Sequence, residues 1–197
     1  MNKVNYEIEM NRILSEGKRS VFMHCCCGPC ATAVVERIKD DCNLTLFYYN
    51  PCIEDQEEYE KRWQNLQKVA DYFSVNAIKS TSYDNEKFRA VSKGYESEKE
   101  GGARCVECFY LRLKETAKKA KEYGYEYFCT TLTISPHKNA DMINALGERI
   151  AQEEGIKWLY SDFKKKGGFL QSTVLSKELG LYRQDYCGCS YGRQREN

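Results

Sequence analysis

The sequence predicts an α/β fold: a three-layer sandwich with a mainly parallel sheet between helices, followed by an irregular cysteine-bearing C-terminal segment. Two observations predict it. Strand-like and helix-like segments alternate along the 197 residues. The strand-like segments are apolar almost throughout, which is typical of parallel strands covered on both faces. We expect one catalytic domain over residues 1–197, because the length suits a single core and no linker or internal repeat is evident.

The strands are predicted from short apolar runs and the helices from apolar residues at helical spacing. The predicted strands are residues 20–24, 44–49, 75–78, 127–132 and 158–160. The predicted helices are residues 6–16, 31–39, 56–73, 109–123 and 141–154. Gly17 is expected to end the first helix. The less periodic residues 80–104 and 161–197 are expected to be irregular or to form short helices.

Charge and hydropathy indicate which partners this protein can have. Thirty basic and 29 acidic residues leave a net charge of +1, so a nucleic-acid partner would have to be met by a local basic patch. The first 17 residues are polar and charged, and no apolar run is long enough to cross a membrane. We therefore expect a cytoplasmic protein that makes no contact with a membrane.

Eleven cysteines are the unusual feature of the composition. Eight of them fall into three groups: CCCGPC at 25–30, CVEC at 105–108 and CGC at 187–189. An odd total, three adjacent cysteines and no export signal argue against a secreted disulfide framework. Metal binding or redox chemistry is the better interpretation.

The positions of these groups predict one shared site. CCCGPC directly follows the first predicted strand, and CVEC precedes or opens a predicted helix. Ligands of open α/β sheets bind beyond the carboxyl ends of the strands. Cys30 is expected near a helix N-terminus, where the helix dipole stabilises a thiolate. Segments after the second and fourth strands, NPCIED and TISPHK, would open onto the same edge.

The spacing alone leaves the chemistry open. A zinc ion could take the pairs Cys27 with Cys30 and Cys105 with Cys108. An iron–sulfur cluster is favoured, because adjacent cysteines serve two corners of a cluster more easily than one zinc ion. A disulfide within CGC would close a strained, easily reduced ring suited to electron relay, although these thiols could equally bind a second metal.

Five ordered motifs resemble a known family. They are HCCCGPC (24–30), YNPCIEDQEEYEKR (49–62), RCVECFYLRL (104–113), TTLTISPHKN (130–139) and YRQDYCGCSYG (182–192). Together they are similar to the QueH-type epoxyqueuosine reductases over nearly the whole chain. The resemblance implies a nucleotide α-hydrolase-like fold and an oxidoreductase that removes the epoxide oxygen from epoxyqueuosine at the wobble position of a tRNA.

The resemblance also implies roles for individual cysteines. A [4Fe-4S] cluster would be held by Cys26, Cys27, Cys105 and Cys108, and Cys187 with Cys189 would form a redox-active pair. It further implies an additional mononuclear iron, with Cys30, Cys187, Cys189 and a carboxylate as candidate ligands. The chain departs from the family pattern at Cys52, where NPCI replaces the usual NPNI, and at Cys25, where the family often carries a non-cysteine.

Reduction of an epoxide to an alkene and water takes two electrons and two protons, so an electron donor, which the sequence does not identify, is expected. His24, Asp185 and Tyr186 lie beside cysteine groups and are candidate proton donors. Lys164, Lys165 and Lys166 are the candidate tRNA phosphate contacts.

Other activities stay open from the residues alone. A zinc-stabilised RNA-binding module would use the same cysteines without a reaction, and a thiol–disulfide oxidoreductase would need no metal. ATP-dependent tRNA modification is disfavoured, because CCCGPC stands where a Gly-rich phosphate loop would follow the first strand.

Overall fold

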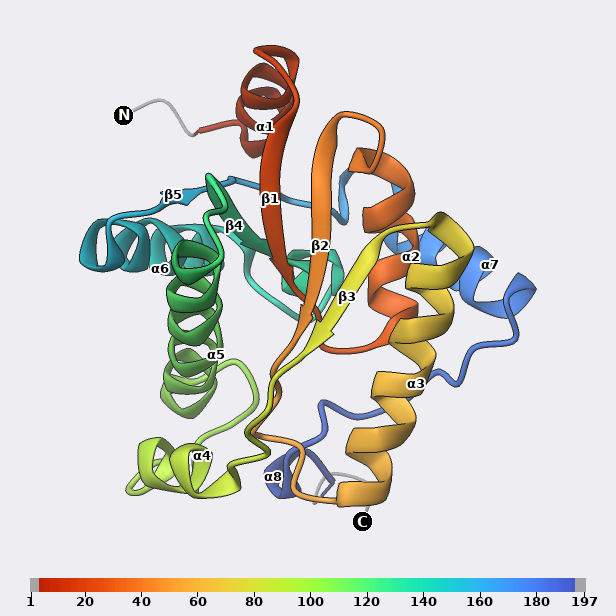
Figure 1. Cartoon of the computed structure of the whole chain (residues 1–197). Coiled ribbons are helices and arrows are strands. Elements are labelled where there is room, and N and C mark those ends of the chain that lie inside the picture. Colours follow the sequence, from red (N-terminus) through yellow and green to blue (C-terminus); the bar gives the residue numbers. More distant parts are fainter. Residues whose placement is uncertain (1–3, 194–197) are drawn as a thin grey trace.

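A computed structural model describes residues 4–193 and contains a five-stranded sheet with helices on both faces (Figure 1). The strand order is β3-β2-β1-β4-β5, and all four neighbouring pairs are parallel. The strands are β1 (Arg19–His24), β2 (Cys42–Tyr48), β3 (Asn76–Lys79), β4 (Tyr127–Thr130) and β5 (Lys157–Trp158). This arrangement confirms the predicted α/β fold with a parallel sheet.

Helices form the two outer layers. On one face α2 packs against both α3 and α7, and on the other α5 packs against α6 (Figure 1). The smaller α4 and α8 lie beyond the carboxyl ends of the strands. The helices are α1 (Tyr6–Ser15), α2 (Gly28–Ile38), α3 (Gln56–Phe73), α4 (Asn85–Ser92), α5 (Ala103–Glu122), α6 (Ala140–Glu154), α7 (Gly168–Glu178) and α8 (Ser190–Arg193), with short 3₁₀ turns η1 (Thr131–Ile134) and η2 (Lys165–Gly167). None of the described helices is long and apolar enough to cross a membrane.

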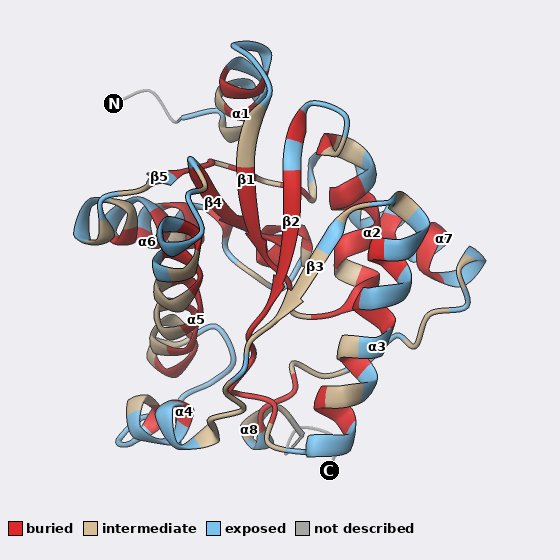
Figure 2. Ribbon diagram, viewed as in Figure 1, coloured by how far each residue is buried: buried red, intermediate tan, exposed pale blue. Residues whose placement is uncertain are grey.

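The core surrounds β1, the central strand, and its two neighbours β2 and β4, which are buried along most of their length (Figure 2). In β1, Val21, Phe22 and Met23 are fully inaccessible to solvent, and so is the polar His24 at its end. His24 pairs in register with Phe47 of β2 and Thr130 of β4. The carboxyl end of the sheet therefore places a buried histidine between two neighbouring strands.

The predicted elements differ from the structure mainly at their ends. The predicted strand 127–132 ends at Thr130, whose hydroxyl accepts the backbone N–H of Leu132 and begins η1. The helix expected from residue 109 begins at Ala103, so CVEC lies inside it. The segment expected to be irregular after residue 161 contains α7, an 11-residue helix. The apolar side chains of Phe169, Leu170 and Val174 on α7 are exposed. Apolar residues of α7 therefore do not recur at helical spacing on one buried face, which is the pattern that predicts a helix.

Candidate active site

The first cysteine group forms the turn between β1 and α2. Cys25 continues the sheet by donating its backbone N–H to the carbonyl of Phe47, and α2 begins at Gly28. A β-carbon at Gly28 would lie 2.5 Å from the backbone oxygen of Asn65 on α3, so only glycine allows this approach. Cys27 occupies the N-cap position, but its side chain makes no capping hydrogen bond. Its sulfur is therefore available for another partner.

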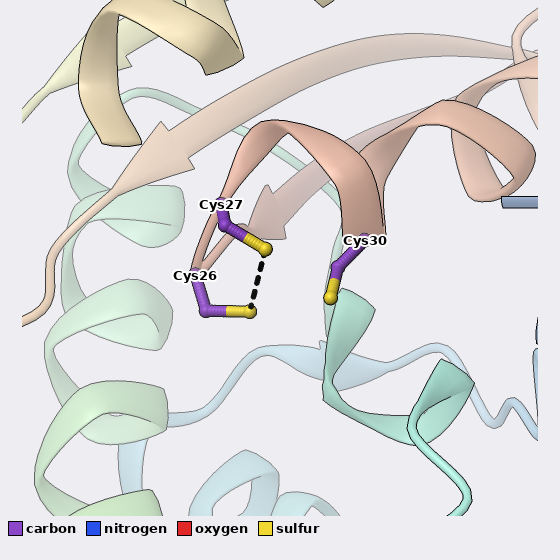
Figure 3. Close-up of side chains that lie close together, drawn as sticks. All are labelled: Cys26, Cys27 and Cys30. Carbon is purple, nitrogen blue, oxygen red and sulfur yellow. Dashed lines mark hydrogen bonds between the residues drawn. The ribbon is translucent and has the colours of Figure 1, made fainter. Parts of the chain in front are cut away.

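Three thiols of this turn converge. The Sγ atoms of Cys26, Cys27 and Cys30 lie within 4.8 Å of one another, and those of Cys26 and Cys27 are 3.8 Å apart (Figure 3). Hydrogen bonding from Cys27 and Cys30 lowers the pKa of Cys26 well below its ordinary value. The same contact raises the pKa of Cys27 to about 12. The group thus favours a thiolate at Cys26, the form that binds metal.

The second cysteine group lies in the first turns of α5. Cys105 and Cys108 are buried, and Cys105 Sγ accepts the backbone N–H of Gly101 across 3.2 Å. Cys108 adjoins Cys52, which follows β2, and this contact lowers the pKa of Cys52 to about 6. The pair does not belong to the compact group of three thiols. Ligands of a four-iron cluster bind different iron atoms, so their sulfurs are spaced more widely than the ligands of one ion.

The third cysteine group is fixed to α3 by Arg62. Arg62 Nη1 donates to the carbonyl of Cys187 across 3.1 Å, and its guanidinium lies 5.1 Å from the centre of the Tyr186 ring. Gly188 has φ +113°, and a β-carbon there would lie 2.9 Å from Ile53. Cys187 and Cys189 are both free thiols. Burial raises the pKa of both, to about 12 at Cys189.

Two adjoining cavities bring the three groups together. One has a volume of about 210 Å³ and is lined by residues from all five segments singled out in the sequence, among them Cys26, Cys30, Arg112, Lys138 and Cys187. The other, of about 80 Å³, is lined by both Cys105 and Cys187 and shares Lys138 with the first. The cysteine groups therefore meet at one place beyond the carboxyl ends of the strands.

Three cations that sequence reasoning did not single out line the larger cavity: Arg62, Arg112 and Lys138. Both arginines are 1% exposed. Lys138 is half-buried, and although burial acts to lower its pKa, the neighbouring Cys187, Cys26 and Cys30 thiols raise it above the ordinary lysine value. The site is thus a group of thiols surrounded by positive charge.

His24 holds one of these cations in place. Arg112 Nε donates to His24 Nε2 across 3.2 Å, Nε2 also lies 3.2 Å from the carbonyl oxygen of Tyr49, and Nδ1 is hydrogen-bonded to Thr130 Oγ1 at 2.9 Å. Burial, together with the charge of Arg112, lowers the pKa of His24 to about 3. The imidazole is therefore neutral near pH 7 and fully enclosed by protein.

Comparison with known proteins agrees with this geometry. A sequence model described as "Epoxyqueuosine reductase QueH" matches residues 21–195. The chain belongs to the QueH family. A QueH of Streptococcus pyogenes is 37% identical over 98% of this chain and 80% of its own length. A QueH of Thermotoga maritima is 39% identical over 87% of this chain and 89% of its own length. A QueH of Staphylococcus epidermidis is 35% identical over 98% of this chain and 87% of its own length. These relatives are named as reductases, so the family is one of oxidoreductases.

A solved structure shares the QueH fold. The U34-tRNA thiolase NcsA from Methanococcus maripaludis, determined with its [4Fe-4S] cluster, superposes with a TM-score of 0.55 over 95% of this chain and 68% of its own. At 15% identity the likeness shows the fold alone. The expected nucleotide α-hydrolase-like fold is confirmed.

The other predicted QueH site residues lie in different places. Asp185 and Tyr186 line the larger cavity, whereas His24 lies behind it and does not line it. Lys164, Lys165 and Lys166 line a separate groove of about 690 Å³ that also reaches Lys138. Lys164 is ion-paired with Asp162 at 2.7 Å, and Lys166 with Glu7 at 2.8 Å. Within residues 4–193 no second compact group of metal-ligating side chains is found beside Cys26, Cys27 and Cys30, so the predicted mononuclear iron has no support.

Proposed function

We propose that this chain reduces epoxyqueuosine at the wobble position of tRNA to queuosine. The observation that carries the proposal is the convergence of three cysteine groups on two adjoining cavities, the larger of them lined by cations, in a member of the QueH family. The three-membered epoxide ring is small enough for the larger cavity. Its reduction needs groups that supply electrons, and thiols are the only ordinary side chains that do so.

The donor set fits an iron–sulfur cluster. We propose Cys26, Cys27, Cys105 and Cys108 as the ligands of a [4Fe-4S] cluster. The first two are adjacent in a turn, Cys105 lines the smaller cavity, and Cys108 contacts Arg112, which lines the larger one. Their low exposure and the surrounding cations suit a buried anionic group. Such a cluster, when bound, would supply electrons one at a time.

Cys187 and Cys189 are proposed as the redox-active pair. Their two thiols release two electrons and two protons on forming a disulfide, which balances the conversion of the epoxide to an alkene and water. A reductant from outside the chain then returns the disulfide to two thiols. The contact of Arg62 with the Cys187 carbonyl and the left-handed conformation at Gly188 support this role, because they fix the CGC turn at the cavity.

Asp185 and Tyr186 are proposed as the groups that deliver protons to the departing oxygen, because both line the cavity. His24 is better suited to positioning Arg112, since its buried, neutral ring does not line the cavity. Lys138 adds a cation on the cavity wall that would attract the developing negative charge on oxygen.

The groove lined by Lys164, Lys165 and Lys166 is proposed to hold the tRNA backbone. Lys138 lines both this groove and the reaction cavity, so the groove leads to the proposed reaction site. Lys165 is exposed and, unlike Lys164 and Lys166, forms no ion pair with the described residues, so it is the best candidate for a phosphate contact. A tRNA substrate also makes the cytoplasm the proposed location.

One observation favours a second candidate, a zinc-stabilised RNA-binding module. Three sulfurs within 4.8 Å match the spacing of thiolates around one tetrahedral zinc ion. Purification without oxygen, followed by a visible spectrum and analyses of iron, sulfide and zinc, separates the two. We expect a brown protein with about four irons and four sulfides per chain. A colourless protein with one zinc after reconstitution with iron and sulfide would favour the binding module.

A further inference from the structure

We propose that Arg112 is the counter-charge of the cluster, a fixed buried cation that stabilises the reduced form and raises the reduction potential. The inference rests on the proposed function, because it concerns the cluster assigned there. It adds a role for a residue that touches that site from α5 and is neither a ligand nor a member of the redox pair.

The guanidinium of Arg112 is held on three sides. Nε donates to His24 at 3.2 Å, Nη2 donates to Asn50 Oδ1 at 2.6 Å, and Nη1 lies 4.0 Å from Cys108 Sγ. Asn50 in turn donates to the carbonyl of Cys25 across 2.9 Å. The charge is thus fixed between the ends of β1 and β2 and one proposed cluster ligand. The planar fork of arginine suits this triple contact, which the single ammonium of lysine would not reproduce.

No carboxylate neutralises this charge within the described part of the chain. The hydrogen-bond partners of Arg112 are a neutral imidazole, a neutral amide and a thiol. The other buried arginine at the site differs, because Arg62 Nε is 2.6 Å from the carboxylate of Glu58. A buried cation without an anion is strongly unfavourable. The surroundings of Arg112 therefore call for another anion.

A cluster bound by the neighbouring cysteines would supply that anion. Arg112 interacts electrostatically with Cys52, Cys108, Cys26 and Cys187, three of which belong to the proposed ligands and redox pair. A cluster held by thiolates is anionic, and one added electron makes it more so. A fixed positive charge nearby therefore lowers the free energy of the reduced cluster more than that of the oxidised one. This raises the potential and eases acceptance of an electron.

The test is the midpoint potential of the cluster in the anaerobically reconstituted full-length protein, followed by EPR during a redox titration. Arg112→Gln removes the charge, and we expect its potential to fall below that of the wild type. Arg112→Lys keeps the charge and is expected to restore part of the difference. The matched control is Lys118→Gln, which removes one positive charge from an exposed position on the same helix, where solvent screens it, and should leave the potential unchanged.

If Arg112→Gln does not fold, Asn50→Asp is the variant to test. It places a carboxylate on the guanidinium with almost no change of shape, and its potential should also fall. An unchanged potential in Arg112→Gln, or in Asn50→Asp where that variant alone folds, would overturn the inference. So would an equal fall in Lys118→Gln. Failure of the proposed function is distinguishable, because wild-type protein would then lack a cluster or leave epoxyqueuosine in tRNA unreduced.

Discussion

Gly28 and Asn65 approach so closely that a β-carbon on Gly28 would lie 2.5 Å from the Asn65 carbonyl oxygen. This contact fixes the turn bearing Cys26 and Cys27 against α3. We predict that Gly28→Ala destabilises the protein by about 1–3 kcal/mol, because the helix must shift to relieve the clash, and that it lowers iron incorporation. Gly192→Ala is the control, since its β-carbon would have no neighbour nearer than 3.7 Å. Equal denaturation midpoints for the two variants would contradict this account of the turn.

The proposed ligands are tested by iron content. Cys26→Ser and Cys108→Ser should each lose most of their iron and sulfide after reconstitution, because a hydroxyl is a poor ligand for iron in a cluster. Cys42→Ser is the matched control: Cys42 is buried like Cys108, and its thiol donates to the Ile38 carbonyl at 3.1 Å, a bond that serine can keep. Full iron content in Cys108→Ser would remove α5 from the proposed metal centre.

The CGC pair is expected to act after the cluster has been built. Cys187→Ser and Cys189→Ser should therefore keep the iron and the visible spectrum of the wild type but lose multiple turnover. The measurement is the number of queuosine molecules formed per enzyme with a limiting chemical reductant. Turnover at the wild-type level in both variants would show that the pair carries no electrons in the reaction.

The lysine groove predicts how binding depends on salt. Lys165→Ala should weaken binding of a tRNA and reduce the slope of log K against log salt by about 1, as expected for one lost phosphate contact. Lys177→Ala, at an exposed position on α7 outside the groove, should leave the slope unchanged. Identical salt slopes for Lys165→Ala and the wild type would exclude this path for the tRNA.

His24 predicts a pH dependence of stability. Its folded pKa, about 3, is below the unfolded value near 6.5, so between these values the unfolded chain binds the additional proton. Stability should therefore fall as the pH falls, by about 0.8 kcal/mol between pH 7.5 and pH 6 from this group alone. The difference in unfolding free energy between wild type and His24→Gln isolates this contribution. His137→Gln, at an exposed position, is the control and should follow the wild type.

The fold and the cysteine groups could be predicted because their signals are local. Buried parallel strands are apolar throughout, and CCCGPC directly follows one of them, so its place at the carboxyl edge of the sheet followed from the alternation of elements. Asp185 and Tyr186 were found by their proximity to the CGC group in sequence. His24 was found in the same way, yet its ring does not line the cavity: it is fully buried and hydrogen-bonded to Thr130 and Arg112.

Arg112 and Lys138 could not be predicted as readily, because their places depend on packing between distant segments. One signal for Arg112 was available: it is four residues after Cys108, on the face of α5 that also carries the buried Leu113 and Thr116. A charged residue on an apolar helix face indicates a buried partner. Lys138 lies in the segment after β4. It lines both the reaction cavity and the lysine groove, and these two are brought together only when the chain folds.

The most direct test of the proposed function is conversion of epoxyqueuosine in tRNA by the anaerobically reconstituted protein and a chemical reductant. The nucleosides of the digested tRNA are then identified by mass spectrometry. We predict that epoxyqueuosine disappears and that queuosine, lighter by one oxygen atom, takes its place in the wild type but not in the Cys108→Ser variant. Unchanged epoxyqueuosine after incubation with protein that carries a complete cluster would contradict the proposed function.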